Sequence, residues 1–161
     1  MYLNIEKMVE KSERVTETFE LISLPGTKVT IKKLDITEYL LSQEDIRFMS
    51  RHFIEKNNKA NEGKAENDPT RVEEWCQLPS ACVVRRALLN EKGDLYFAGK
   101  SMLDVYETLT KLPVDAYAEI ATAVDELNPT TAEALQARRD KQLEEKKRQL
   151  EEATALEKST A

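Results

Sequence analysis

The chain has little of the material from which most catalytic sites are built. Its 161 residues include one histidine, two cysteines, four glycines and one tryptophan. His52 would have to serve alone in any serine or cysteine hydrolase mechanism. It stands in a segment typical of the end of a helix, where a cationic histidine is an ordinary partner of the helix dipole. We therefore expect His52 to be structural.

The two cysteines do not predict a metal site. Cys76 and Cys82 are six residues apart with Pro79 between them, whereas zinc needs about four ligands at short, paired spacings. Both are interpreted as small, buried apolar residues. The first residues are polar and lack the apolar region of a secretory signal, which favours a reducing cytoplasm. No apolar run approaches the roughly 18–20 residues of a membrane span.

Phosphate-binding and calcium-binding loops are missing as well. Residues 98–101, AGKS, match the end of a phosphate-binding loop, but Asp94 stands where the motif requires its first glycine. The stretch is better interpreted as a turn before a helix that Ser101 caps, with Asp104 completing an S-x-x-D capping box. No alternating Asp and Asn pattern around a glycine is present for calcium. The sequence therefore predicts no cofactor, no metal and no enzymatic activity.

Charge is plentiful and mostly acidic. Asp and Glu outnumber Lys and Arg by 30 to 24, a net charge of -6, so a protein-wide basic field for nucleic acid is absent. The last segment, residues 129–161, is rich in Ala, Glu, Gln, Lys and Arg. Its large apolar residues are Leu135, Leu143, Leu150 and Leu156, at spacings that do not hold a strict heptad. We expect a solvated helix or a weak coiled-coil strand, which also suits an arm for a partner.

The remaining residues predict a mostly α, small α+β fold with four to five core helices. Residues 1–17 are expected to form a polar helix and residues 18–128 a globular domain, with residues 57–70 as a mobile loop. Period-2 alternation in 18–34, with Pro25–Gly26 as the turn, predicts a β-hairpin. Helices are predicted at 36–56, 71–77, 80–90, 102–111 and 114–127. In the short helix 71–77, Val72, Trp75 and Cys76 are expected to face inward.

Residues 82–127 carry a resemblance to a known family. They combine an apolar helix, an acidic turn with glycine, the aromatic pair Tyr96–Phe97, a capped helix, a Leu112–Pro113 break and an amphipathic helix. This order resembles the tail assembly chaperones of long-tailed bacteriophages. The upstream hairpin, with VTIKKLDITEYL at residues 29–40, is similar to their N-terminal part. Together the similarity covers about two-thirds of the chain.

The resemblance implies a non-enzymatic role in the host cell cytoplasm. Members of the family bind the long, hydrophobic tape measure protein, help the major tail tube protein polymerise around it and are absent from the finished particle. Many exist in two lengths through a ribosomal frameshift, and this chain would be the short, non-frameshifted form. A homo-oligomer is also expected, while binding of membranes or nucleic acid is not.

A chaperone of this kind needs apolar contact surface, offset by net charge that keeps the complex in solution. The faces of helices 36–56 and 114–127, or an exposed hairpin edge, would supply it. The candidate partner contacts are Tyr39, Phe53, Tyr96, Phe97, Tyr117, Leu135, Leu143 and Leu150. Two other functions stay open, a structural tail or connector protein of the virion and a small regulatory nucleic-acid-binding module.

Overall fold

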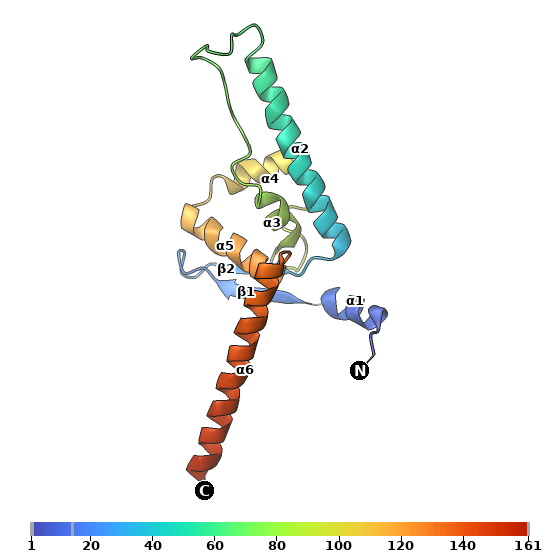
Figure 1. Ribbon diagram of the computed structural model, residues 1–161, viewed down its shortest axis with the longest axis vertical. Helices are drawn as coiled ribbons and strands as arrows, with labels where there is room; N and C mark the ends of the chain where they lie inside the picture. Colours follow the sequence, from blue (N-terminus) through green and yellow to red (C-terminus); the bar gives the residue numbers. More distant parts are fainter. Residues whose placement is uncertain (1, 14, 161) are drawn as a thin grey trace. The chain divides into compact units, whose positions relative to one another are not determined.

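The computed structural model describes residues 2–13 and 15–160. In chain order these residues form α1 (Ile5–Glu13), β1 (Thr16–Glu20), β2 (Lys28–Lys32), α2 (Ile36–Ala60), α3 (Ala81–Ala87), β3 (Leu88–Leu89), α4 (Met102–Leu109), α5 (Val114–Leu127) and α6 (Ala132–Thr160). Helices dominate, and the strands of the described residues form a small antiparallel sheet (Figure 1). The predicted mostly α, small α+β fold is confirmed.

The chain divides into two compact units, residues 1–124 and residues 125–161. The boundary falls within the last turn of α5. The first unit holds the sheet, helices α1 to α4 and most of α5. The second unit holds the end of α5 and the whole of α6.

Helix α2 begins at a capping box. The Asp35 carboxylate accepts a hydrogen bond from the Glu38 N–H at 2.7 Å, and the Glu38 carboxylate accepts one from the Asp35 N–H at 3.3 Å. Asp35 is therefore the residue that caps α2. The helix runs one turn beyond the predicted end, through Ala60, so His52 lies inside the helix rather than at its C-terminus.

The hairpin forms as predicted. Phe19 pairs with Val29 across β1 and β2, and the Thr18 and Thr30 hydroxyls lie 2.8 Å apart. The turn closes with the Thr27 N–H donating to the Leu24 carbonyl at 3.1 Å. Gly26 takes a φ of 89° at the second corner, which favours glycine there because it has no Cβ.

The helix predicted over residues 80–90 is wrong at its last three residues. Helix α3 ends at Ala87, and Leu88 and Leu89 turn into the extended strand β3 beside Ile31 and Thr30 of β2. A two-stranded hairpin is marginal in water, and a third strand supplies further backbone hydrogen bonds and apolar cover. This pairing between distant residues overrides the local helical pattern.

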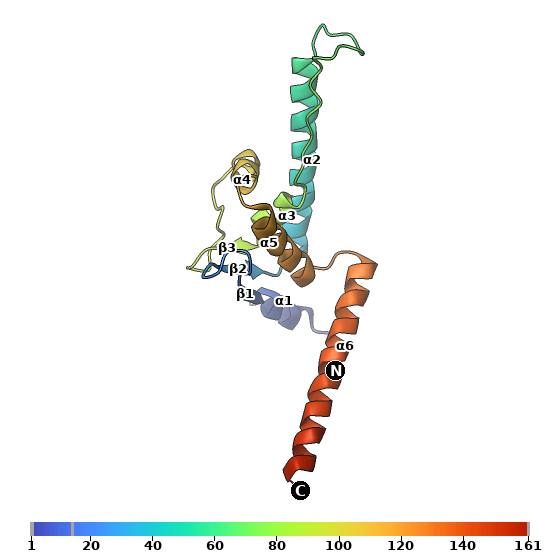
Figure 2. The same cartoon turned by 90° about the vertical axis from the view of Figure 1, so that its left-hand side faces the viewer.

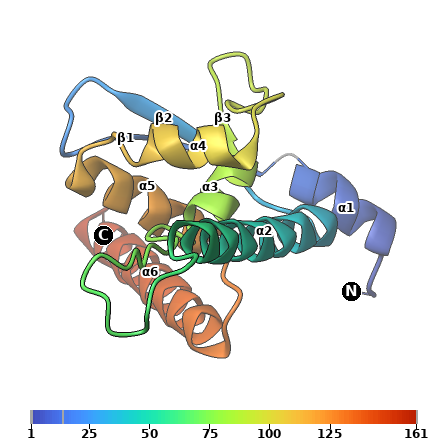
Figure 3. The same cartoon turned by 90° about the horizontal axis from the view of Figure 1, so that it is seen from above.

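Helix α3 occupies the middle of the first unit, between α2 and α4 (Figure 3). Four of its seven residues are buried, as expected for the most apolar stretch of the chain. The buried apolar residues of the first unit are Leu21, Val29, Ile31, Met49, Ala81, Cys82, Val84, Ala87, Phe97, Met102, Val105, Leu109, Ala116, Tyr117, Ile120 and Val124.

The helix predicted over residues 71–77 does not form. Residues 61–80 run back along α2 without helix, and Figure 2 shows this segment beside the long helix. Trp75, expected to face inward, is 65% exposed. The backbone of this segment bonds to side chains of α2 instead of to itself, as described below for the cleft.

The N-terminal helix is shorter than the predicted 1–17. Helix α1 spans Ile5–Glu13, and Thr16 and Glu17 belong to β1. The Lys7 N–H donates to the Asn4 side-chain oxygen at 3.0 Å, which places Asn4 as a cap. Residues 1 and 14 lie outside the described part of the chain.

In the second unit, α6 starts after Thr131, whose hydroxyl accepts a hydrogen bond from the Ala134 N–H at 3.0 Å. The Arg138 guanidinium donates to the Leu127 carbonyl at 3.1 Å, which fixes the first turns of α6 on the end of α5. No residue of α6 is buried, and Leu135, Leu143, Leu150 and Leu156 are all exposed. The described helix is solvated, as the charged sequence predicts.

The two thiols lie in different environments, which yields a direct prediction. Burial raises the pKa of Cys82 to about 11, whereas Cys76 is partly exposed. At pH 8 only about one Cys82 in a thousand is the reactive thiolate. We expect iodoacetamide to alkylate the folded protein once, at Cys76, and twice only in denaturant. Rapid native labelling at Cys82, read by peptide mass spectrometry, would contradict the burial.

Candidate functional site

A cleft of about 600 Å³ opens in the first unit between the second half of α2, residues 73–77 and α4. Its lining residues are His52, Phe53, Lys56, Glu73, Glu74, Trp75, Gln77, Leu103, Tyr106, Glu107 and Thr110. We call it the aromatic cleft. Its volume lies in the range of ligand pockets, and four of its lining side chains are rings.

Two asparagines at the end of α2, Asn57 in the helix and its C-cap residue Asn61, hold one wall of the cleft in place. Asn57 donates to the Glu74 carbonyl at 2.7 Å and accepts from the Glu74 N–H at 3.0 Å. One turn later, Asn61 donates to the Val72 carbonyl and accepts from the Val72 N–H, both at 2.7 Å. Each side-chain amide thus pairs with a backbone amide as a neighbouring β-strand would. The spacing of four on the helix matches the spacing of two along an extended chain.

This amide clamp explains why residues 71–77 form no helix. Four hydrogen bonds to α2 replace the bonds that a short helix would have made within itself. Val72 is partly buried, whereas Glu73, Glu74 and Trp75 are exposed and line the cleft. The clamp therefore sets where the Trp75 ring stands at the cleft.

The aromatic rings contact one another across the two helices. The Phe53 ring lies 5.9 Å from the Tyr106 ring and 5.4 Å from the His52 ring, both edge to face. The Tyr106 hydroxyl accepts a hydrogen bond from the Gln77 N–H at 3.3 Å, which ties α4 to the extended segment. Phe53 and Tyr106 are half-buried, whereas the Trp75 side chain remains exposed.

Carboxylates dominate the charge of the cleft. Its lining holds Lys56 and three glutamates, and the Lys56 ammonium is paired with Glu74 at 2.7 Å. The nearest cation to the Glu107 carboxylate is Lys111, 4.0 Å away in the turn after α4. Among the described residues, no cation lies within 4.0 Å of the Glu73 carboxylate. The cleft is therefore negative at its rim.

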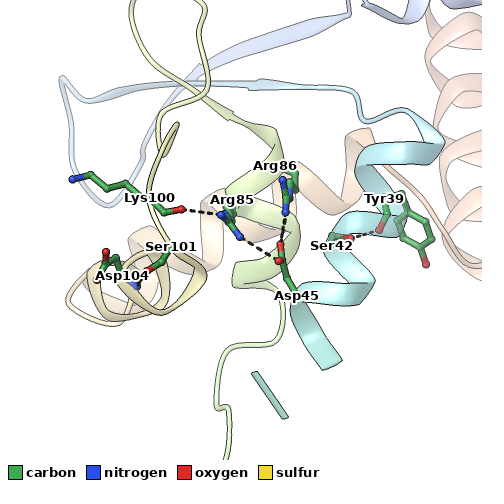
Figure 4. Close-up of polar contacts among 8 residues, drawn as sticks. All are labelled: Tyr39, Ser42, Asp45, Arg85, Arg86, Lys100, Ser101 and Asp104. Atoms are coloured by element: carbon green, nitrogen blue, oxygen red, sulfur yellow. Dashed lines mark hydrogen bonds and ion pairs between the residues drawn. The ribbon is translucent and has the colours of Figure 1, made fainter. Parts of the chain in front are cut away.

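An ion-pair network nearer the start of α2 fixes the helices that form the cleft. The Asp45 carboxylate binds Arg85 at 3.2 Å and Arg86 at 2.9 Å (Figure 4). The other end of the Arg85 guanidinium donates to the Lys100 carbonyl at 2.8 Å, just before Ser101 caps α4. Asp45 thus connects α2, α3 and the start of α4. These side chains are largely buried, so the network is interpreted as structural.

The eight candidate partner contacts do not form one surface in the structure. Phe53 lines the cleft. Tyr39 is partly exposed on α2, and Tyr96 is 58% exposed on the turn before α4. The three leucines of the set, Leu135, Leu143 and Leu150, lie exposed on α6 in the second unit.

Phe97 and Tyr117 belong to the core, which removes them as surface contacts. Phe97 is 8% and Tyr117 is 9% exposed. The Tyr117 hydroxyl lies 2.6 Å from the Ser80 hydroxyl, and burial raises the pKa of this tyrosine. Both side chains are therefore largely covered by the rest of the first unit.

Sequence reasoning missed Trp75 and Tyr106 as site residues. Trp75 was predicted to face inward on a helix, and the signal against this was present in the asparagines of the preceding segment. Asn57 and Asn61 are four apart and stood in what was interpreted as a loop. On a helix this spacing puts both amides on one face, where they pair with extended backbone.

No group of His, Cys, Asp and Glu in the described part of the chain is suited to hold a metal ion. Within residues 2–13 and 15–160, no helix is both long and apolar enough to cross a membrane. Comparison of the chain with protein-family models, with curated proteins and with solved structures gives no match. The site must therefore be interpreted from its own geometry.

Proposed function

We propose that this chain is a bacteriophage tail assembly chaperone, which binds the tape measure protein and promotes tail tube polymerisation around it. It would act in the host cytoplasm, as the short form, and would be absent from the mature virion. The observation that carries the proposal is the aromatic cleft, where Phe53, Tyr106 and an exposed Trp75 remain accessible between helices. Rings held in this way are typical of protein-binding surfaces.

The resemblance of residues 82–127 to the chaperone family supports the same function. That segment forms α3, β3, α4 and α5, and α4 supplies Tyr106 and Glu107 to the cleft. Further apolar side chains are exposed on α1 and α2, including Met8, Leu40 and Ile54. The net charge of -6 would keep a complex with an apolar partner in solution.

Co-expression with the tape measure protein of the same genome tests the proposal. We expect the tape measure protein to be soluble with this chain and to co-purify with it, and to aggregate without it. Trp75→Ala should lower the co-purified amount at least fivefold, because an exposed tryptophan that a partner covers on binding is a frequent hot spot of interfaces. Lys92→Ala is the control, since Lys92 is exposed in the turn before α4 and does not line the cleft.

Two results would overturn the proposal. One is a tape measure protein whose solubility does not depend on the chain. The other is recovery of the chain from purified virions by mass spectrometry in amounts like those of tail proteins. The second result would favour the alternative of a structural tail or connector protein.

A further inference from the structure

The aromatic cleft combines two features that together select one kind of side chain. Rings present a negative π face, and carboxylates surround them. Trp75 is the best of the aromatic residues for attracting a cation over its face. Glu73 and Glu107 lie in the same lining, and neither is closely paired with a basic residue. An ammonium or guanidinium group bound here would neutralise part of the negative charge of the cleft.

The cleft also offers apolar contact beside the charge. Phe53, Leu103 and the body of Tyr106 line it, so the stem of a long basic side chain and an apolar neighbour would both be covered. Lys56 does not already fill this role, because its ammonium is bound to Glu74. An acidic or phosphate-bearing ligand is disfavoured, since three carboxylates line the cleft.

We infer that the aromatic cleft binds a lysine or arginine side chain that projects from an apolar segment of a protein partner. The tape measure protein as the source of that segment rests on the proposed function, whereas the chemistry of the site does not. Trp75 provides the cation–π face, Glu73 and Glu107 provide the charge, and Phe53 and Tyr106 cover the apolar stem. The Asn57 and Asn61 amides hold the tryptophan-bearing segment in position.

Trp75 also reports on the site, because it is the one tryptophan of the chain. The probe is an amphipathic helical peptide of Leu, Ala and Lys, titrated into the full-length protein at low salt. Two matched peptides replace every Lys with Glu or with Gln. We expect the Lys peptide to shift the tryptophan emission with saturation, and to bind about tenfold more tightly than the Gln peptide. The Glu peptide should give no saturable change.

Paired variants test whether peptide binding depends on the glutamates of the cleft or only on the overall negative charge of the protein. Glu73→Gln with Glu107→Gln should weaken the Lys peptide about tenfold and reduce the salt dependence of its binding. Glu6→Gln with Glu91→Gln removes the same charge from exposed positions outside the cleft and should leave the affinity within twofold. With a fluorescein-labelled peptide read by anisotropy, Trp75→Leu should weaken binding at least fivefold and Trp75→Phe less.

Equal affinity for the Lys and Glu peptides, or an affinity that the cleft variants and the control variants lower equally, would overturn the inference. Failure to bind the Lys peptide at all would overturn it too. These results are distinguishable from failure of the proposed function. If the chain solubilises the tape measure protein but does not bind the Lys peptide, the proposed function stands and the inferred lysine or arginine site is wrong. If the chain binds the Lys peptide through Trp75 but does not bind the tape measure protein, the inferred site stands and the proposed function is wrong.

Discussion

Asp45→Ala is expected to lower the free energy of unfolding by about 3 kcal/mol. The Asp45 carboxylate faces both Arg85 and Arg86, at 3.2 and 2.9 Å, and all three side chains are at most 21% exposed. Removing the carboxylate leaves two largely buried cations without a counter-charge, which costs about 3–5 kcal/mol in a fully buried pair. The partial exposure of this network places the expected loss at the lower end of that range.

Urea unfolding followed by circular dichroism measures this loss, and the chain offers a matched control. Glu44→Ala removes the adjacent, exposed acid of α2 and should change stability by less than about 0.5 kcal/mol. Asp45→Asn, which keeps the size and part of the hydrogen bonding, should fall between the two. If Asp45→Ala unfolds at the same urea concentration as Glu44→Ala, the network does not hold the helices together.

A further variant tests whether charge itself is needed. Asp45→Leu combined with Arg85→Met and Arg86→Met replaces the whole network with apolar side chains. Buried ion pairs and triads replaced in this way are often neutral in stability or better. We therefore expect the triple variant to be more stable than Asp45→Ala, because no charge is left unpaired. A triple variant less stable than Asp45→Ala would mean that these side chains act through their shape.

Features set by neighbouring residues could be predicted from the sequence. The capping box of Asp35 and Glu38, the turn at Pro25–Gly26 and the cap at Ser101 all form. The amphipathic stripe over 114–127 gives α5 with the predicted bounds. Each of these depends on residues within about one helical turn, where propensity and hydrogen bonding act without help from the rest of the fold.

Features set by distant partners could not be predicted. Leu88 and Leu89 follow the helical pattern of α3, yet they extend because Ile31 and Thr30 lie beside them. Residues 71–77 resemble a helix by composition, but α2 binds their backbone. The candidate site depends on this second case, since Trp75 reaches the cleft only when its segment is extended. Local periodicity therefore predicted most of the helices, but not the extra strand β3 or the surface that Trp75 occupies.

The amide clamp accordingly carries the second large prediction. Asn57→Ala combined with Asn61→Ala removes four hydrogen bonds that hold Val72 and Glu74 on α2. At roughly 1 kcal/mol for each bond, less what water restores, about 2–3 kcal/mol of local stability is lost. We expect hydrogen exchange at the Val72 and Glu74 amides to accelerate about a hundredfold, while amides of α3 change much less.

The adjacent Asn58 distinguishes the clamp from the general effect of losing an asparagine. Asn58 is exposed on α2 and does not line the cleft, so Asn58→Ala should leave the exchange of both amides unchanged. Asn57→Asp should have an intermediate effect, because the carboxylate still accepts from the Glu74 N–H but no longer donates to its carbonyl. If the double alanine variant exchanges like Asn58→Ala, residues 71–77 are held by other contacts. If exchange does accelerate in the double alanine variant, that variant should also fail to bind the Lys peptide. Glu73 and Trp75 belong to the segment that the clamp releases, so they would leave their positions in the cleft.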